Sequence, residues 1–311
     1  MERMDADVFE AGRDRLASLA YRLLGSAADA EDVVQDAYLR WQATDRGYVE
    51  VPEAWLTKTV ANLCVDRLRS AHHRHERPVD TLPEPLLEGD PMLGPADTAV
   101  QRESVSMAVL TLMRDLTAHQ RAAYVLREAF KYSHSDIAEM LDITEAASHQ
   151  HLHRARARIG AGSRADREVD PDEARRVVEA FLSAAVSGRT DELVALLTDD
   201  ATAVSDGAGL AAKLLELPSP QSMAAAFRAF AKPTDAKRRI LGGAPALHTA
   251  VVNGSPAIIA ALQDRVVAAA VFEFDGCKVA HVHSLAATSR LRRLDARWRT
   301  ADHGEAVVEA W

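Results

Sequence analysis

The spacing of apolar residues changes along this chain, and that change limits the folds open to it. Over roughly the first 160 residues, apolar side chains recur every three to four positions, as on one face of an α-helix. From Pro171 onward, two helical stretches are followed by short runs rich in Val, Ile and Ala. The change predicts an all-helical part followed by a separate α+β part.

Two stretches divide the chain. Residues 78–98 hold five prolines and two glycines, which remove backbone donors and fix backbone angles until no helix can persist. Residues 161–170 are mostly polar, include Gly162 and are followed by Pro171. We therefore expect a helical domain over 1–77, a linker over 78–98, a second helical domain over 99–162, an α+β domain over 171–294 and a tail over 295–311.

Local signals place the helices of the first two domains. Gly25 and Ser26 interrupt an apolar pattern running from residue 7 to 41, which predicts a helical hairpin, and Pro52 suits the first turn of the next helix. Further helices are expected over 99–114, 117–130, 133–141 and 145–159.

The α+β domain has a different set of signals. Helices are expected over 171–187 and 190–197, and strands over 246–253, 257–265, 266–274 and 279–285. The dipeptides Asn253-Gly254 and Asp275-Gly276 lie between strands and favour tight hairpins, because both turn positions tolerate positive φ. An antiparallel sheet follows from this order.

Composition excludes several classes of protein. Cys64 and Cys277 lie far apart with no ligand spacing around them, so we expect no disulfide framework, metal site or cofactor. No stretch reaches the ~18 apolar residues that a spanning helix needs, and we expect a cytoplasmic protein without membrane contact. The formal net charge is −9, yet residues 58–77 and 145–164 are locally basic, a distribution suited to DNA held at two places.

Residues 133–159 have the form of a helix-turn-helix. A short helix, a three-residue turn and a second helix follow one another, and the second helix exposes Gln150 and Arg154, which can pair with adenine and guanine edges. An ordinary helical hairpin with a solvated basic face is the alternative when this segment is considered alone.

Three motifs in order resemble a known family. They are Asp29-Ala30-Glu31-Asp32-Val33-Val34-Gln35-Asp36, Ala54-Trp55-Leu56-Thr57 with Asp66-Arg67-Leu68-Arg69, and Leu116-Thr117-Ala118-His119-Gln120 with Arg154-Ala155-Arg156-Ala157-Arg158. Together they resemble regions two and four of sigma factors of the extracytoplasmic-function (ECF) type. The resemblance implies polymerase binding by Asp29, Glu31, Asp32, Gln35 and Asp36. It implies DNA binding by Lys58, Asn62, Arg67, Arg69, Ser148, His149, Gln150, His153, Arg154, Arg156 and Arg158.

Residues 171–294 resemble the SnoaL-like domain, an α+β cone with an antiparallel sheet, that one ECF subgroup carries behind region four. Leu82-Pro83-Glu84-Pro85 matches the linker motif of that subgroup, and Asp206-Gly207-Ala208-Gly209 matches its glycine-rich motif in part, with Leu210 in place of a Lys. The resemblance implies interdomain docking by Leu82, Pro83, Glu84, Pro85, Asp206 and Gly207.

We therefore expect a sigma factor, not an enzyme, that binds core RNA polymerase and promoter DNA and is regulated in cis by its C-terminal domain. One alternative is a SnoaL-like enzyme or a sensor of a small-molecule ligand tethered to a DNA-binding module. Its candidate residues are Asp206, His248, His281 and His283, since acid–base chemistry needs a titrating group beside a carboxylate. Another alternative is a helix-turn-helix repressor that acts without polymerase.

Overall fold

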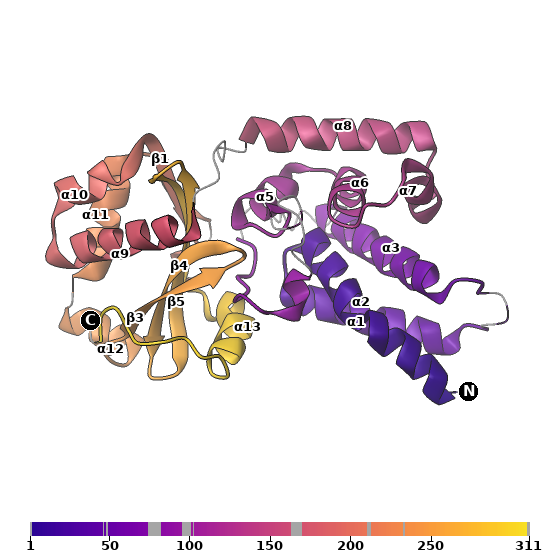
Figure 1. Cartoon of the computed structure of the whole chain (residues 1–311), viewed down its shortest axis with the longest axis horizontal. Helices are drawn as coiled ribbons and strands as arrows, with labels where there is room; N and C mark the ends of the chain where they lie inside the picture. The colour runs from indigo at the N-terminus through magenta and orange to yellow at the C-terminus, as the bar shows by residue number, and fades with distance from the viewer. Residues whose placement is uncertain are drawn as a thin grey trace. The chain divides into compact units, whose positions relative to one another are not determined.

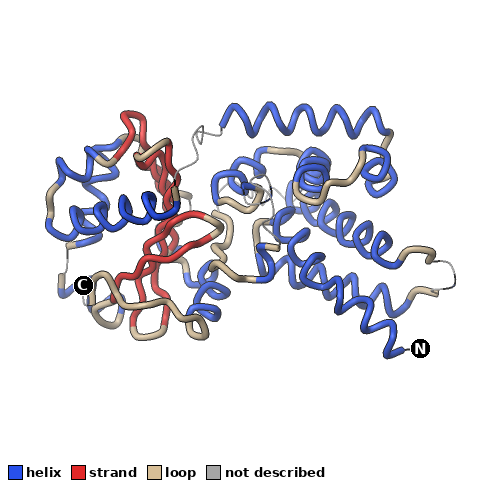
Figure 2. The backbone as a smooth tube through the Cα atoms, in the orientation of Figure 1, coloured by secondary structure: helices blue, strands red, loops and turns tan. Residues whose placement is uncertain are grey.

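The computed structural model describes residues 2–45, 47, 49–73, 82–94, 101, 103–162, 170–209, 213–232 and 234–309. The chain divides into two compact units. The helical unit comprises Met1–Val79 and Gly89–Gly162, and the sheet unit comprises Asp80–Glu88 and Ser163–Trp311. Figure 2 shows that the strands all belong to the second unit, as the change in apolar spacing predicted.

Three long helices open the helical unit: α1 (Glu2–Leu24), α2 (Ala27–Ala43) and α3 (Pro52–His73). They pack against one another around buried Leu19, Val34 and Val60 (Figure 1). Gly25 adopts a φ of 68°, which ends α1, and the Ser26 hydroxyl accepts the amide of Asp29 at 3.2 Å to begin α2. The predicted hairpin and the helix start at proline are confirmed.

The rest of the helical unit is built from shorter elements. They are η3 (Pro91–Leu93), α5 (Met107–Leu112), η4 (Met113–Asp115), α6 (Ala118–Glu128), α7 (His134–Leu141) and α8 (Glu145–Gly162). The predicted single helix over 99–114 is interrupted: Gln101 and Glu103 are helical, residues 104–106 form a turn, and α5 begins at Met107, where the Ser106 hydroxyl accepts the amide of Val109. Residues 95–100 and 102 lie outside the described residues.

The sheet unit has one sheet of six strands in the order β2-β1-β6-β5-β4-β3. The strands are β1 (Leu197–Ser205), β2 (Leu215–Leu217), β3 (Ala246–Val252), β4 (Ser255–Leu262), β5 (Arg265–Asp275) and β6 (Lys278–Leu285). The four predicted strands and both predicted hairpins are confirmed. The sheet is mixed rather than wholly antiparallel, because β1 pairs parallel to β6. The predicted helix over 190–197 ends at Ala195, where the chain turns into β1.

Helices cover both faces of this sheet. They are α9 (Pro171–Ser187), α10 (Thr190–Ala195), α11 (Pro220–Ala231), α12 (Asp235–Leu241) and α13 (Thr288–Trp298), with η5 (Gly207–Gly209) after β1. Phe181 of α9 and Phe227 of α11 pack on Phe272 in the main core, which also includes Leu247. The next residue, His248, points to the opposite face and contacts Trp298 of α13.

The predicted domain boundaries stay predictions, and the structure adds two facts that bear on them. Helix α13 continues past residue 294 to Trp298, whose side chain is fully buried. Beyond it, Val308 forms an isolated bridge with Leu247 of β3. The stretch predicted as a tail therefore packs on the sheet unit.

Candidate polymerase and DNA interfaces

Helix α2 separates an apolar side from an acidic side. Its buried residues are Ala27, Ala30, Val33, Val34, Ala37 and Trp41, which leaves the predicted polymerase contacts Glu31, Asp32, Gln35 and Asp36 exposed. Leu39, one turn further along, is 55% exposed on the same side. Sequence reasoning missed Leu39, although its spacing from Gln35 and Asp36 was the available signal.

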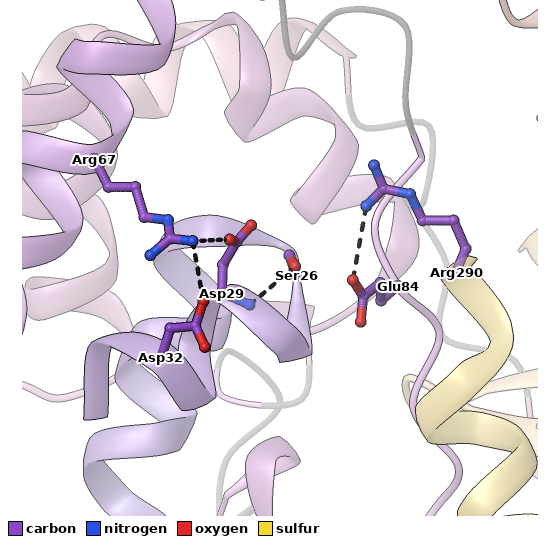
Figure 3. A network of polar contacts seen from close by, with 6 residues as sticks. All are labelled: Ser26, Asp29, Asp32, Arg67, Glu84 and Arg290. Atoms are coloured by element: carbon purple, nitrogen blue, oxygen red, sulfur yellow. Dashed lines mark hydrogen bonds and ion pairs between the residues drawn. The ribbon is translucent and has the colours of Figure 1, made fainter. Parts of the chain in front are cut away.

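Arg67 of α3 joins the two predicted sites. Its guanidinium contacts the carboxylate of Asp29 and lies 3.2 Å from that of Asp32 (Figure 3). A predicted DNA contact is thereby paired with two predicted polymerase contacts. The pair is largely exposed, so it contributes at most about 1 kcal/mol to stability and leaves all three groups available to partners.

The other predicted DNA contacts of α3 differ in their surroundings. Lys58 is half-buried and Arg69 is exposed. Asn62 donates its side-chain amide to the carbonyl oxygen of Met140 in α7, at 2.9 Å. Helix α3 is therefore bonded to the helix-turn-helix in this conformation. Of the wider basic cluster, Arg74, His75 and Arg77 lie outside the described residues, as do the side chains of His72 and His73.

The helix-turn-helix forms as its sequence predicts. Ser133 and Asp136 form a reciprocal capping box at the start of α7, and Asp142 ends that helix in the left-handed conformation. Thr144 accepts the amide of Ala147 at 3.1 Å and so begins α8. Apolar Ile137, Leu141, Leu152, Ala155 and Ile159 are buried.

The predicted contacts on α8 fall into three groups. His149, Gln150, His153 and Arg154 are exposed. Arg156 pairs with Glu128 at 2.8 Å and Arg158 pairs with Asp115 at 2.8 Å, so both also brace α8. Ser148 departs from the expectation: its side chain is fully buried and its hydroxyl lies 2.9 Å from Nδ1 of His134. In this conformation Ser148 is structural rather than a DNA contact.

Two stacked histidine pairs fix α8 to its neighbours. The His134 and His149 rings lie 3.5 Å apart, and those of His119 and His151 lie 5.7 Å apart. Burial lowers the pKa of His134, His119 and His151, and a neighbouring imidazole lowers it further for His134 and His151. The lowered pKa of these three side chains favours the neutral imidazole, which suits ring stacking.

Two arginines are buried where α6 packs on α1 and α3. Arg22 donates to the Ser104 hydroxyl at 3.0 Å and to the carbonyl oxygen of Leu93 at 2.8 Å. Arg121 donates only to the carbonyl oxygen of Arg22, at 3.4 Å, and its Nε has no partner among the described residues. Burial lowers the pKa of Arg22 to about 10 and that of Arg121 to about 9. Neither guanidinium pairs with a carboxylate in the part of the chain that the structure covers, a costly arrangement that sequence reasoning missed.

The linker motif packs within the sheet unit. Leu82 and Leu86 are 1% and 0% exposed, and Pro83 and Pro85 are also buried. Leu86 exchanges two hydrogen bonds with Asn253, one to each backbone group, at 2.8 and 2.9 Å. Glu84 lies 3.9 Å from Arg290 of α13 (Figure 3). The linker therefore forms an added edge segment beside β3.

The glycine-rich motif supports α13. The Asp206 carboxylate accepts the amides of Ala208, Ala286 and Ala287 at 2.9 Å each. Gly207 begins the short helix η5, and Leu210 lies outside the described residues. Every hydrogen bond described for Asp206 lies within the sheet unit, and its docking role stays a prediction.

The candidate acid–base residues of the sheet unit do not all lie together, although the rings of His281 and His283 are 4.5 Å apart. His283 is 2.7 Å from Glu273, and His281 is 2.7 Å from the Thr202 hydroxyl. His248 packs instead with Trp298 and His303. Across the residues covered, no group of three or more His, Cys, Asp or Glu could hold a metal ion.

Comparison with known proteins defines the class first. Residues 8–74 match the family model of sigma-70 region 2, and residues 106–159 match that of sigma-70 region 4. The chain therefore has regions 2 and 4 of a sigma-70 type initiation factor. Among the helices described, none is both long and apolar enough to cross a bilayer.

Individual relatives define the family. The ECF RNA polymerase sigma factor SigJ of Mycobacterium tuberculosis is 40% identical over 210 residues, 67% of each chain. A probable ECF sigma factor of that organism, SigI, is 32% identical over 61% of this chain and 65% of its own. The SigJ crystal structure superposes with a TM-score of 0.69 at 27% identity, covering 93% of this chain and 98% of that one.

The chain belongs to the ECF RNA polymerase sigma factors, and it spans about two thirds of the length of these curated relatives. The predicted fusion of two helical sigma regions with a C-terminal sheet domain is confirmed, because the structural match extends through both units.

Proposed function

We propose that this sigma factor recruits core RNA polymerase through the exposed acidic side of α2 and recognises promoter DNA through α3 and α8. We further propose that the sheet unit restrains these steps in cis by holding the linker. Because both partners operate in the bacterial cytoplasm, we place its action there. The observation that carries the proposal is the docked linker, which leaves the helical unit after Val79 and returns to it at Gly89.

The geometry of the linker supports restraint of initiation by the sheet unit. The minus-ten and minus-thirty-five elements lie about 25 base pairs apart, or about 85 Å of B-DNA. Regions two and four must therefore separate to occupy both, yet Asn62 of α3 is bonded to Met140 of α7. A fully extended 78–98 linker spans about 70 Å, and keeping 82–88 docked fixes about a third of it to the sheet unit, so the two regions cannot move apart freely. We infer that the linker must leave β3 before initiation.

Transcription by core polymerase plus the full chain, from a promoter selected from genomic fragments, tests both parts. Leu86→Ala should raise the yield at limiting sigma factor, because a buried Leu→Ala change costs about 2–5 kcal/mol of packing. The exposed Glu88→Ala is the matched control and should change nothing. No initiation with the wild-type chain would reject polymerase recruitment. An unchanged or lower yield with Leu86→Ala would reject restraint.

We propose that the sheet unit does this without catalysis. His283 lies beside the carboxylate of Glu273, but its ring is only 2% exposed, so a substrate has no open path to it. His248 packs elsewhere, with Trp298 and His303. A ligand that modulates the sheet unit remains a prediction. A metabolite screen with the full chain addresses both points, and turnover in that screen would overturn the non-catalytic proposal.

A further inference from the structure

Helix α13 and its C-terminal cap form a basic segment on the sheet unit. Residues 288–299 contain five arginines (Arg290, Arg292, Arg293, Arg297 and Arg299) and one acid, Asp295, which gives a net charge of +4. The whole chain has a formal net charge of −9. A basic helix on an acidic protein concentrates its attraction for anions at one surface.

The apolar residues of the segment face inward. Leu291, Leu294 and Trp298 are at most 2% exposed. Arg292 and Arg299 are exposed on the other side, the latter over 52% of its side chain. Among the described residues, Arg292 forms one hydrogen bond, 3.5 Å long, to the carbonyl oxygen of Ser289, so its exposed guanidinium has little structural role.

The two acids nearby hold the segment in place rather than cover it. Asp295 accepts the amide of Val266 with one oxygen, at 2.8 Å, and pairs with Arg299 through the other, at 2.7 Å. Glu84 of the docked linker lies 3.9 Å from Arg290. These contacts position two guanidinium groups, and among the described residues neither acid pairs with Arg292.

We propose that the exposed side of α13, centred on Arg292 and Arg299, binds the phosphate backbone of duplex DNA. Arginine favours phosphate because its planar fork donates two parallel hydrogen bonds. Arg292 and Arg299 lie two helical turns apart, about 10 Å along the axis, which matches three 3.4 Å steps along a DNA strand. Exposed Ser289 and Thr300 flank them with hydroxyl groups of the kind that contact phosphates.

This inference deepens the proposed function, since it gives the sheet unit its own contact with DNA, but it does not need a specific promoter. The contact carries no sequence information, so its signature is salt dependence. Log affinity falls linearly with log salt concentration, and each phosphate contact makes that fall steeper by about 0.9. The slope of this fall is given as its magnitude. Losing both arginines should lower that slope by about 1.8.

The test is a salt titration of the full chain with a mixed-sequence 30-base-pair duplex. Arg292→Gln should lower the slope by about 0.9, and the double change with Arg299→Gln by about 1.8, with unchanged thermal unfolding. The matched control is Arg238→Gln with Arg239→Gln, the same loss of charge at two exposed positions of α12. That control should leave the slope unchanged.

Several results would overturn the proposal. They are an unchanged slope in the α13 variants, an equal fall in the α12 control, or a loss of affinity for core polymerase in place of DNA, which would mark α13 as a protein-docking surface. Failure of the sigma function is seen separately, as no initiation by the wild-type chain with polymerase, and leaves the duplex titration interpretable.

Discussion

Replacing Arg121 by methionine should stabilise the packing of α6 on α1 and α3. Arg121 is 3% exposed, and burial lowers its pKa to about 9. Because one pKa unit corresponds to about 1.4 kcal/mol, burial of this charge, together with repulsion from Arg114, costs on the order of 5 kcal/mol. Its one hydrogen bond to the described residues, 3.4 Å long, returns about 1 kcal/mol. An apolar side chain of similar length avoids the cost, and exchanges of this kind stabilise proteins by about 1–4 kcal/mol.

Urea denaturation of the full chain, followed by far-UV circular dichroism, measures the change. Hydrogen exchange of the α6 amides locates it. Arg121→Met should increase the free energy of unfolding of the helical unit by about 1–4 kcal/mol and slow association with core polymerase, since regions two and four separate less readily. Arg154→Met, at an exposed position of α8, is the control and should leave stability within about 0.5 kcal/mol. A loss of stability in Arg121→Met would refute the reasoning.

Three further outcomes are expected. Arg154→Ala should weaken promoter binding by about 1–3 kcal/mol in a gel-shift assay if the side chain reads a base edge, and unchanged affinity would exclude that role. Arg67→Ala should change the melting temperature little, because its ion pairs are exposed; a large fall would contradict this. The folded-state pKa of His134 is lowered, so the unfolded chain binds more protons below the ordinary histidine pKa of about 6.5. Stability should therefore be full above pH 7 and fall on acidification, and His149→Ala should flatten that dependence in thermal melts.

Local chemistry made the helical unit predictable from sequence. Caps such as Ser133 and Thr144 act over three residues, and the acidic side of α2 follows from helical spacing alone. The burial of Arg22 and Arg121 could not be predicted, because it depends on α1 and α6 meeting across about 100 residues of chain. Ser148 was misassigned for a related reason, since its burial depends on the placement of His134 in the neighbouring helix.

In the sheet unit, hairpins were predictable and crossovers were not. Asn253-Gly254 and Asp275-Gly276 mark tight turns whatever surrounds them. Strand β1 includes Asp199 and Asp200, which interrupt the alternation of apolar and polar residues that marks a strand. Its parallel partner β6 lies about 80 residues away in the chain. The docking of the linker on β3 depends on Asn253, a residue predicted only as the end of a strand and the start of a turn.

The separation of regions two and four on binding polymerase is the central claim, and energy transfer within the full chain measures it. Donor and acceptor dyes can be placed at exposed Asp66→Cys on α3 and Ala157→Cys on α8 after exposed Cys277 is replaced by Ser, since Cys64 is fully buried. Adding core RNA polymerase should lower the transfer efficiency, and Leu86→Ala should lower the polymerase concentration needed. Unchanged efficiency in a complex that initiates transcription would contradict the account.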